Sequence, residues 1–274
     1  RPPFPLGPVH QGHDPPLLSL PSHSLMKRLL LALVGTLPLH AHDTWVQLNT
    51  STTPAKQSVY VDLMLGNHGN NHRDFLLASK IPLENSTLTL LAADRSTTDL
   101  KPSLADRGLD PKEGFWTSRI TPASSGLYCV HHTYDAVVTY APKRSRKFAK
   151  AFFQAGDETS TSFSTPLGHA LEIVPLVDPT RLSAGDKLKA KVLLNGQPYK
   201  DAVISCIPQG TELTEDFDPA HEARTDAEGQ AELPLPEANR YLVVVHHKAP
   251  EEKADNYSAG TEYAATLTLL VRDR

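Results

Sequence analysis

Histidine is the residue type in this sequence that is best suited to chemistry. Of its 13 histidines, nine follow position 41. Imidazole nitrogen is a common protein ligand for Ni(II), Co(II), Cu(II) and Zn(II). Only two cysteines and, after position 41, one methionine are present, so thiolate-rich and thioether-rich sites are disfavoured. The nine histidines are His42, His68, His72, His131, His132, His169, His221, His246 and His247.

The first of these histidines follows an export signal. Lys27 and Arg28 form a positive head, and residues 29–39 form an apolar run that is too short to span a bilayer. Residues 39–41 fit a small-residue cleavage site that ends at Ala41, so the mature chain is expected to begin at His42. A histidine at the amino terminus offers two ligands, its α-amine and its ring nitrogen.

Two alternatives remain open at this terminus. Cleavage after Leu39 would place His42 at position three, where the amine, two backbone amides and the ring chelate square-planar Cu(II) or Ni(II). A histidine after a signal peptide can also be a flexible first residue without a ligand.

The remaining histidines favour a site assembled from several loops and strands. His68 follows a predicted strand at residues 58–65, and His132, His246 and His247 belong to two His-His pairs. Neighbouring residues of a strand point to opposite faces, so each pair supplies at most one ligand to a common ion. We expect His42, His68 and one of His246 or His247 as ligands, with His132 as a further candidate.

Composition and patterning predict an exported all-β protein. Residues 1–25 resemble a mistranslated or disordered leader, and 26–41 the signal peptide. The net charge of -4 gives no reason to expect nucleic-acid binding, and no later apolar run suggests stable membrane insertion. Cys129 and Cys206 are compatible with an oxidising compartment such as the periplasm without forming a disulfide framework.

Short alternating strands separated by turns predict two immunoglobulin-like β-sandwich domains in tandem, at residues 42–166 and 167–274. Tyr128, just inside a strand, is placed like the tyrosine of an immunoglobulin corner, and Tyr241 begins a similar strand that also ends in a His-His pair. Residues 141–153 are basic, which predicts a short helix or excursion with a solvated charged face.

No hydrolytic, P-loop or dinucleotide motif is present, so we do not expect an enzyme. Two other functions are weighed. Copper oxygenases that cleave polysaccharides use an amino-terminal histidine on a β-sandwich, but aromatic residues make up only 7% here and are not clustered. A metal-free adhesive or carbohydrate-binding module would leave the histidines without a role.

The order of short motifs resembles a family of bacterial periplasmic proteins, a domain of unknown function linked to nickel or cobalt uptake (the nickel-transport-complex family). Ala41-His42-Asp43-Thr44-Trp45 is similar to its mature start, and Gly66-Asn67-His68 to its Gly-His at a strand end. The resemblance implies a two-domain β protein associated with transition-metal handling. The sequence departs from the family at Asn70-Asn71-His72.

Together these features predict a periplasmic Ni(II)- or Co(II)-binding protein, with Cu(II) and Zn(II) as alternatives, that serves metal uptake or buffering. Its expected partners are the metal ion and a membrane metal transporter.

Overall fold

The computed structural model describes residues 42–66, 73–74, 77–108, 110, 113–138, 141–213 and 217–274. Across these ranges the chain forms β-strands and two short 3-10 helices, η2 (Lys101–Ser103) and η3 (Ser162–Ser164), which confirms the all-β prediction. Within the same ranges no helix has the length and apolar character needed to cross a membrane.

One sheet is built from the first part of the chain. Its strands follow the order β1-β3-β9-β8, and β5 also pairs with β3. The strands are β1 (Asp43–Leu48), β3 (Val59–Gly66), β5 (Leu77–Ser79), β8 (Ala105–Asp106) and β9 (Trp116–Ile120).

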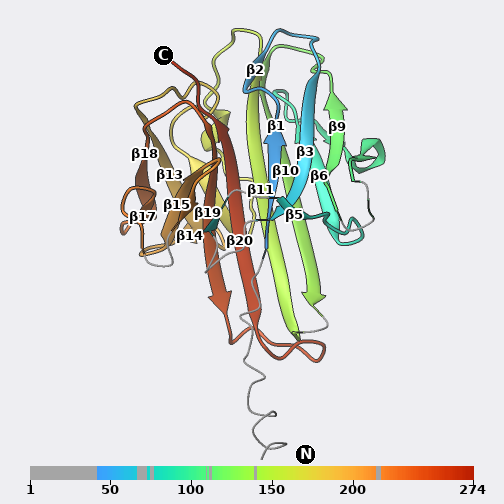
Figure 1. Ribbon diagram of the computed structural model, residues 1–274, viewed down its shortest axis with the longest axis vertical. Helices are drawn as coiled ribbons and strands as arrows, with labels where there is room; N and C mark the ends of the chain where they lie inside the picture. Colours follow the sequence, from blue (N-terminus) through green and yellow to red (C-terminus); the bar gives the residue numbers. More distant parts are fainter. Residues whose placement is uncertain are drawn as a thin grey trace, which may run out of the picture. The chain divides into compact units, whose positions relative to one another are not determined.

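A nine-stranded sheet carries the longest strands (Figure 1). Its order is β17-β15-β19-β20-β11-β10-β6-β7, and β2 also pairs with β11. The strands are β2 (Thr52–Thr53), β6 (Ser86–Leu91), β7 (Thr97–Asp99), β10 (Gly126–Val138), β11 (Lys143–Ala155), β15 (Val203–Pro208), β17 (Glu222–Arg224), β19 (Arg240–Ala249) and β20 (Thr261–Leu270).

Two smaller sheets complete the fold. A four-stranded sheet pairs β13 with β12, β14 and β18, and a two-stranded sheet joins β4 to β16. The strands are β4 (Arg73–Asp74), β12 (Leu171–Pro175), β13 (Asp186–Leu194), β14 (Gln197–Pro198), β16 (Glu212–Leu213) and β18 (Gln230–Leu235).

The nine-stranded sheet contains strands from both predicted domains. Its centre is a parallel pairing of β11 with β20, which runs from Arg144 opposite Thr261 to Ala151 opposite Thr268. The boundary predicted at Leu167 lies in the connection between β11 and β12, and residues 40–274 form one compact unit. The two halves therefore share a sheet.

Both faces of the long strands are buried, because alternate side chains enter different cores. Tyr128 and Val130 pack with the β1-β3-β9 sheet, whereas Leu127 and Cys129 pack with the four-stranded sheet. The same alternation continues in β11, where Phe153 and Phe152 enter opposite cores. Cys129 and Cys206 are both buried and free.

The prediction for residues 141–153 was wrong. These residues form most of β11, and Lys147 and Lys150 are buried in it. The charges suggested a solvated face, but pairing of β11 with both β10 and β20 places it in the sheet interior.

Both halves contain a tyrosine corner. The Tyr128 hydroxyl donates to the Ser124 carbonyl oxygen at 2.9 Å, as the sequence predicts. The Tyr241 hydroxyl donates to the Glu237 carbonyl oxygen at the same distance and the same separation of four residues. The repeated Tyr-led strand is therefore a repeated structural element.

Candidate functional site

The candidate site lies where β1 begins, next to the expected mature amino terminus. Asp43 pairs with Gly66, the last residue of β3. The carbonyl oxygen of Thr44 accepts a hydrogen bond from Thr266 Oγ1 of β20 at 2.8 Å. The next two side chains pack on different strands of that sheet. Trp45 packs with Leu242 and Val244 of β19, whereas Val46 packs with Val130 of β10. The edge strand β1 thus rests on one face of the nine-stranded sheet, with Trp45 over β19 and Val46 over β10.

This arrangement joins Asp43 to a histidine 203 positions away. The Asp43 carboxylate is fully buried, and its Oδ1 lies 2.8 Å from Nε2 of His246, a side chain that is 36% exposed. A carboxylate accepts hydrogen bonds, so Nε2 carries the hydrogen. Burial acts to lower the pKa of His246, but the charge and hydrogen bond of Asp43 outweigh it and raise the pKa.

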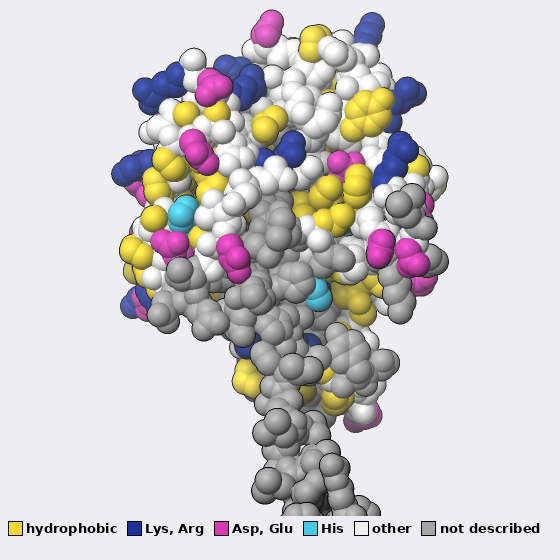
Figure 2. Space-filling view, viewed as in Figure 1, with side chains coloured by type: hydrophobic (Ala, Val, Ile, Leu, Met, Phe, Trp, Pro, Cys, Tyr) yellow, Lys and Arg dark blue, Asp and Glu magenta, His cyan; other side chains and the backbone are white. Residues whose placement is uncertain are grey.

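Asp43 also fixes the orientation of the His246 ring. With its hydrogen on Nε2, the neutral imidazole keeps its lone pair on Nδ1, which has no hydrogen-bond partner in the described part of the chain. In metal sites a carboxylate often accepts a hydrogen bond from one ring nitrogen of a histidine whose other nitrogen binds the metal. Figure 2 shows that histidine side chains reach the surface on the viewed side of the molecule, among acidic, basic and hydrophobic ones.

Lys147 adds a buried cation to the same face. It pairs in register with Ala264, which in turn pairs with His246. Its side chain makes no hydrogen bond or ion pair with any described residue. Burial lowers the pKa of Lys147 to about 8, although the Asp43 carboxylate acts in the opposite direction. The Lys147 ammonium group therefore repels any further positive charge on this face.

His132 lies on the same face but away from His246. Strands β11 and β20 separate β10 from β19, and His132 is level with Val244, so the two histidines lie three inter-strand spacings and two residues apart, about 16 Å. His132 is fully buried and its Nδ1 donates to the Thr87 carbonyl oxygen at 2.7 Å. Its Nε2 has no hydrogen-bond partner among the residues described. Burial lowers the pKa of His132 to about 3.

His247 occupies the opposite face of the sheet from His246. Its Nδ1 lies 2.8 Å from the Tyr199 hydroxyl, and its ring packs on Tyr199 and Tyr263. Of the two neighbouring histidines, only His246 is therefore directed toward Asp43.

The other two predicted ligands flank this point in the chain. His42 immediately precedes β1 and is partly exposed. His68 lies outside the described residues, two positions beyond Gly66. In the ranges that the structure covers, no three histidine, cysteine, aspartate or glutamate side chains form a group that could hold a metal ion.

Sequence reasoning missed Asp43 and Lys147. Asp43 belongs to the motif at the expected mature start, and its position beside His42 is the sequence feature that could have identified it. Lys147 gave no signal, because its charge matched its basic neighbours.

Comparison with known proteins gives one family match. The model of a family described as a domain of unknown function (DUF4198) matches residues 39–249. No curated protein matches the chain.

Among solved structures, Salmonella alpha-2-macroglobulin reacted with methylamine is 12% identical with a TM-score of 0.27, and the match covers 84% of this chain and 15% of that one. Murine CEACAM1b is 11% identical with a TM-score of 0.22, over 85% of this chain and 100% of that one. The Yersinia pseudotuberculosis adhesin InvE is 10% identical with a TM-score of 0.22, over 84% and 58%. These likenesses are too distant to bear on function.

Proposed function

This chain belongs to the DUF4198 family of domains of unknown function, and we propose that it is a periplasmic protein that binds a transition-metal ion at the start of β1. The ion is Ni(II) or Co(II), with Cu(II) and Zn(II) as alternatives. Binding serves metal uptake or buffering, and no catalytic step is involved.

The observation that carries this proposal is the hydrogen bond between Asp43 Oδ1 and His246 Nε2. It connects the residue after His42 to a distant histidine and leaves His246 Nδ1 available as a ligand. If the mature chain begins at His42, its α-amine and ring add two nitrogen ligands beside the same carboxylate.

The described residues fit a borderline metal ion better than a hard one. The candidate ligands are nitrogen atoms, and the carboxylate of Asp43 orients a histidine. His42 and His246 would hold the ion, with His68 as the expected further ligand. The role of the chain is to place these nitrogens in advance, which lowers the entropic cost of binding.

Calorimetric titration of protein that begins at His42 tests the proposal. We expect binding below micromolar Kd to at least one of Ni(II), Co(II), Cu(II) and Zn(II). His246→Gln should weaken it by about 100-fold, because a ligand is lost. His247→Gln is the matched control, since it removes the neighbouring histidine on the opposite face.

A second variant tests the amino terminus. Two residues added before His42 block the α-amine but leave every side chain in place, so we expect a loss of affinity similar to that of His246→Gln. If the extended and native proteins bind equally, the terminal amine is not a ligand. If no ion binds below micromolar Kd, the proposed function is wrong.

A further inference from the structure

An open cavity with charged lining residues lies beyond the far end of β1 from Asp43. Its volume is about 760 Å³, within the range of small-molecule sites. β20 pairs with β11 as far as Ala151, and β2 pairs with β11 further on, at Gln154 and Ala155. The cavity opens where one strand replaces the other. Residues from the first half (52–55, 154, 156 and 157) and the second half (181–183, 272 and 273) line it.

A fixed guanidinium group belongs to the cavity wall. Arg272 Nη2 donates to Ser51 Oγ and to the Thr180 carbonyl oxygen, both at 2.9 Å. Both acceptors are neutral, and no carboxylate lies within ion-pair distance of Arg272 in the described part of the chain. The positive charge is therefore held in position without a counter-ion.

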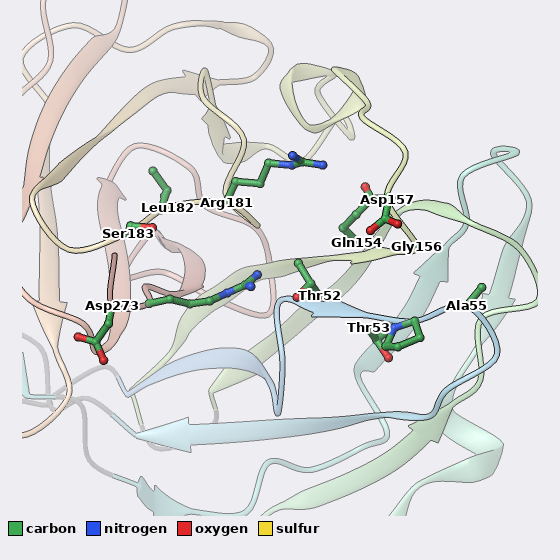
Figure 3. Close-up of a pocket in the computed structure, with 12 residues that line it drawn as sticks. Thr52, Thr53, Ala55, Gln154, Gly156, Asp157, Arg181, Leu182, Ser183 and Asp273 are labelled. Carbon is green, nitrogen blue, oxygen red and sulfur yellow. The ribbon is translucent and has the colours of Figure 1, made fainter.

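A second guanidinium and two carboxylates, those of Asp157 and Asp273, line the same cavity. Arg181 extends toward Asp157 and Gln154 at the end of β11 (Figure 3). Its Nε lies 3.4 Å from Asp178, and the side chain is half exposed. Asp157 is exposed and makes no ion pair with a described residue. The lining thus offers positive and negative groups that do not neutralise each other.

We propose that this cavity binds a small zwitterion of the amino-acid type, a free amino acid or a short peptide. The ligand carboxylate pairs with Arg272 and Arg181, whose planar guanidinium groups match carboxylate geometry. The ligand ammonium group pairs with Asp157. Because lining residues come from both halves of the chain, binding also holds the carboxyl-terminal segment against β2 and β11. The site is independent of the proposed metal site, since the six residues of β1 separate them by about 20 Å.

Titration calorimetry with four probes tests the charges that the site requires. The probes are alanine, the dipeptide Ala-Ala, N-acetyl-Ala-Ala, which lacks the ammonium group, and Ala-Ala amide, which lacks the carboxylate. We expect saturable binding of alanine or Ala-Ala, and affinities about tenfold or more lower for both blocked peptides, because each loses one charge-assisted contact. Alanine and Ala-Ala distinguish a free amino acid from a peptide.

Two pairs of variants assign the binding to this cavity. Arg181→Gln and Asp157→Asn should each weaken binding of the better probe about tenfold or more. Their matched controls, Arg274→Gln and Glu158→Gln, neutralise exposed neighbours outside the lining and should leave it unchanged. Arg272→Gln should abolish binding. If Arg272→Gln does not fold, the affinity of Arg181→Gln tests the proposal in its place. The proposal is overturned if neither alanine nor Ala-Ala binds, or if a blocked peptide binds with the same affinity as Ala-Ala. It is also overturned if the cavity variants bind the probe as tightly as their controls.

Discussion

Lys150 of β11 and Glu172 of β12 form an ion pair in the interior, with 2.7 Å between Nζ and Oε1 and at most 2% of either side chain exposed. The Glu172 carboxylate also accepts hydrogen bonds from the backbone N–H groups of Leu167, Gly168 and His169. This single carboxylate therefore fixes the connection between the two halves of the chain.

Glu172→Gln should destabilise the protein by about 3 kcal/mol, because it leaves the Lys150 ammonium buried without its counter-charge. Urea denaturation followed by circular dichroism measures the change. Glu232→Gln, which breaks an exposed pair with Lys189, is the control and should leave the denaturation midpoint unchanged. A midpoint for Glu172→Gln equal to that of the control would mean that the buried pair adds no net stability.

The shared nine-stranded sheet predicts that residues 42–274 unfold in one cooperative transition. β11 from the first half and β20 from the second pair along eight residues of each strand, so neither half keeps its sheet alone. Differential scanning calorimetry should give equal calorimetric and van't Hoff enthalpies. The separate fragments 42–166 and 167–274 should lack a sharp thermal transition. Two resolved transitions would instead indicate independent domains.

The two tyrosine corners provide a matched test of equivalence between the halves. Tyr128→Phe and Tyr241→Phe each remove a hydrogen bond to a carbonyl oxygen four residues back, and each should cost about 1 kcal/mol. Because the corners lie in separate places, the double variant should lose about the sum. Chemical denaturation of the three variants measures these costs. Unequal losses would show that the two corners are not equivalent.

Stability should fall as the pH is lowered below 6.5. Burial lowers the pKa of His132 to about 3 and that of His169 to about 4, so both stay neutral in the folded protein while the unfolded chain binds protons. Their contribution is therefore complete above pH 6.5 and is progressively lost toward the folded-state values.

His132→Asn removes one of these groups and retains a donor near Nδ1. It should reduce the slope of stability against pH by about 1.4 kcal/mol per unit between pH 6 and 4. Urea titrations at several pH values measure this slope. An unchanged slope would show that His132 is not kept neutral by burial.

Local patterns predicted much of the fold. The strand over residues 58–65 corresponds closely to β3, and the corner at Tyr128 is present, because both depend on residues close together in sequence. The pairing of β11 with β20 depends on residues far apart in the chain, and alternation carries no information about such a partner. Burial of Lys147 and Lys150 was missed for the same reason, since both neighbours of β11 were needed to place it in the interior.

The candidate site shows the same division. The position after the signal peptide identified His42 as a candidate, and the His-His pair identified His246. Alternation alone assigned His246 and His247 to opposite faces of the strand, but it could not show which of the two faces contacts β1. Only the position of β1 on the sheet selects His246, and only that position brings in Asp43 and Lys147.

Lys147 provides a sharp test of the proposed metal site. Its ammonium group lies on the same face as His246 and interacts with Asp43, so it repels a divalent ion bound there. Lys147→Met keeps the length of the side chain and removes the charge. It should therefore tighten binding of the preferred ion by about tenfold, as measured by calorimetry at pH 7. Lys189→Met removes an exposed charge from β13 and should leave the affinity unchanged. Equal affinities for the two variants would indicate that the ion binds away from the start of β1, because the repulsion falls with distance and solvent screens it.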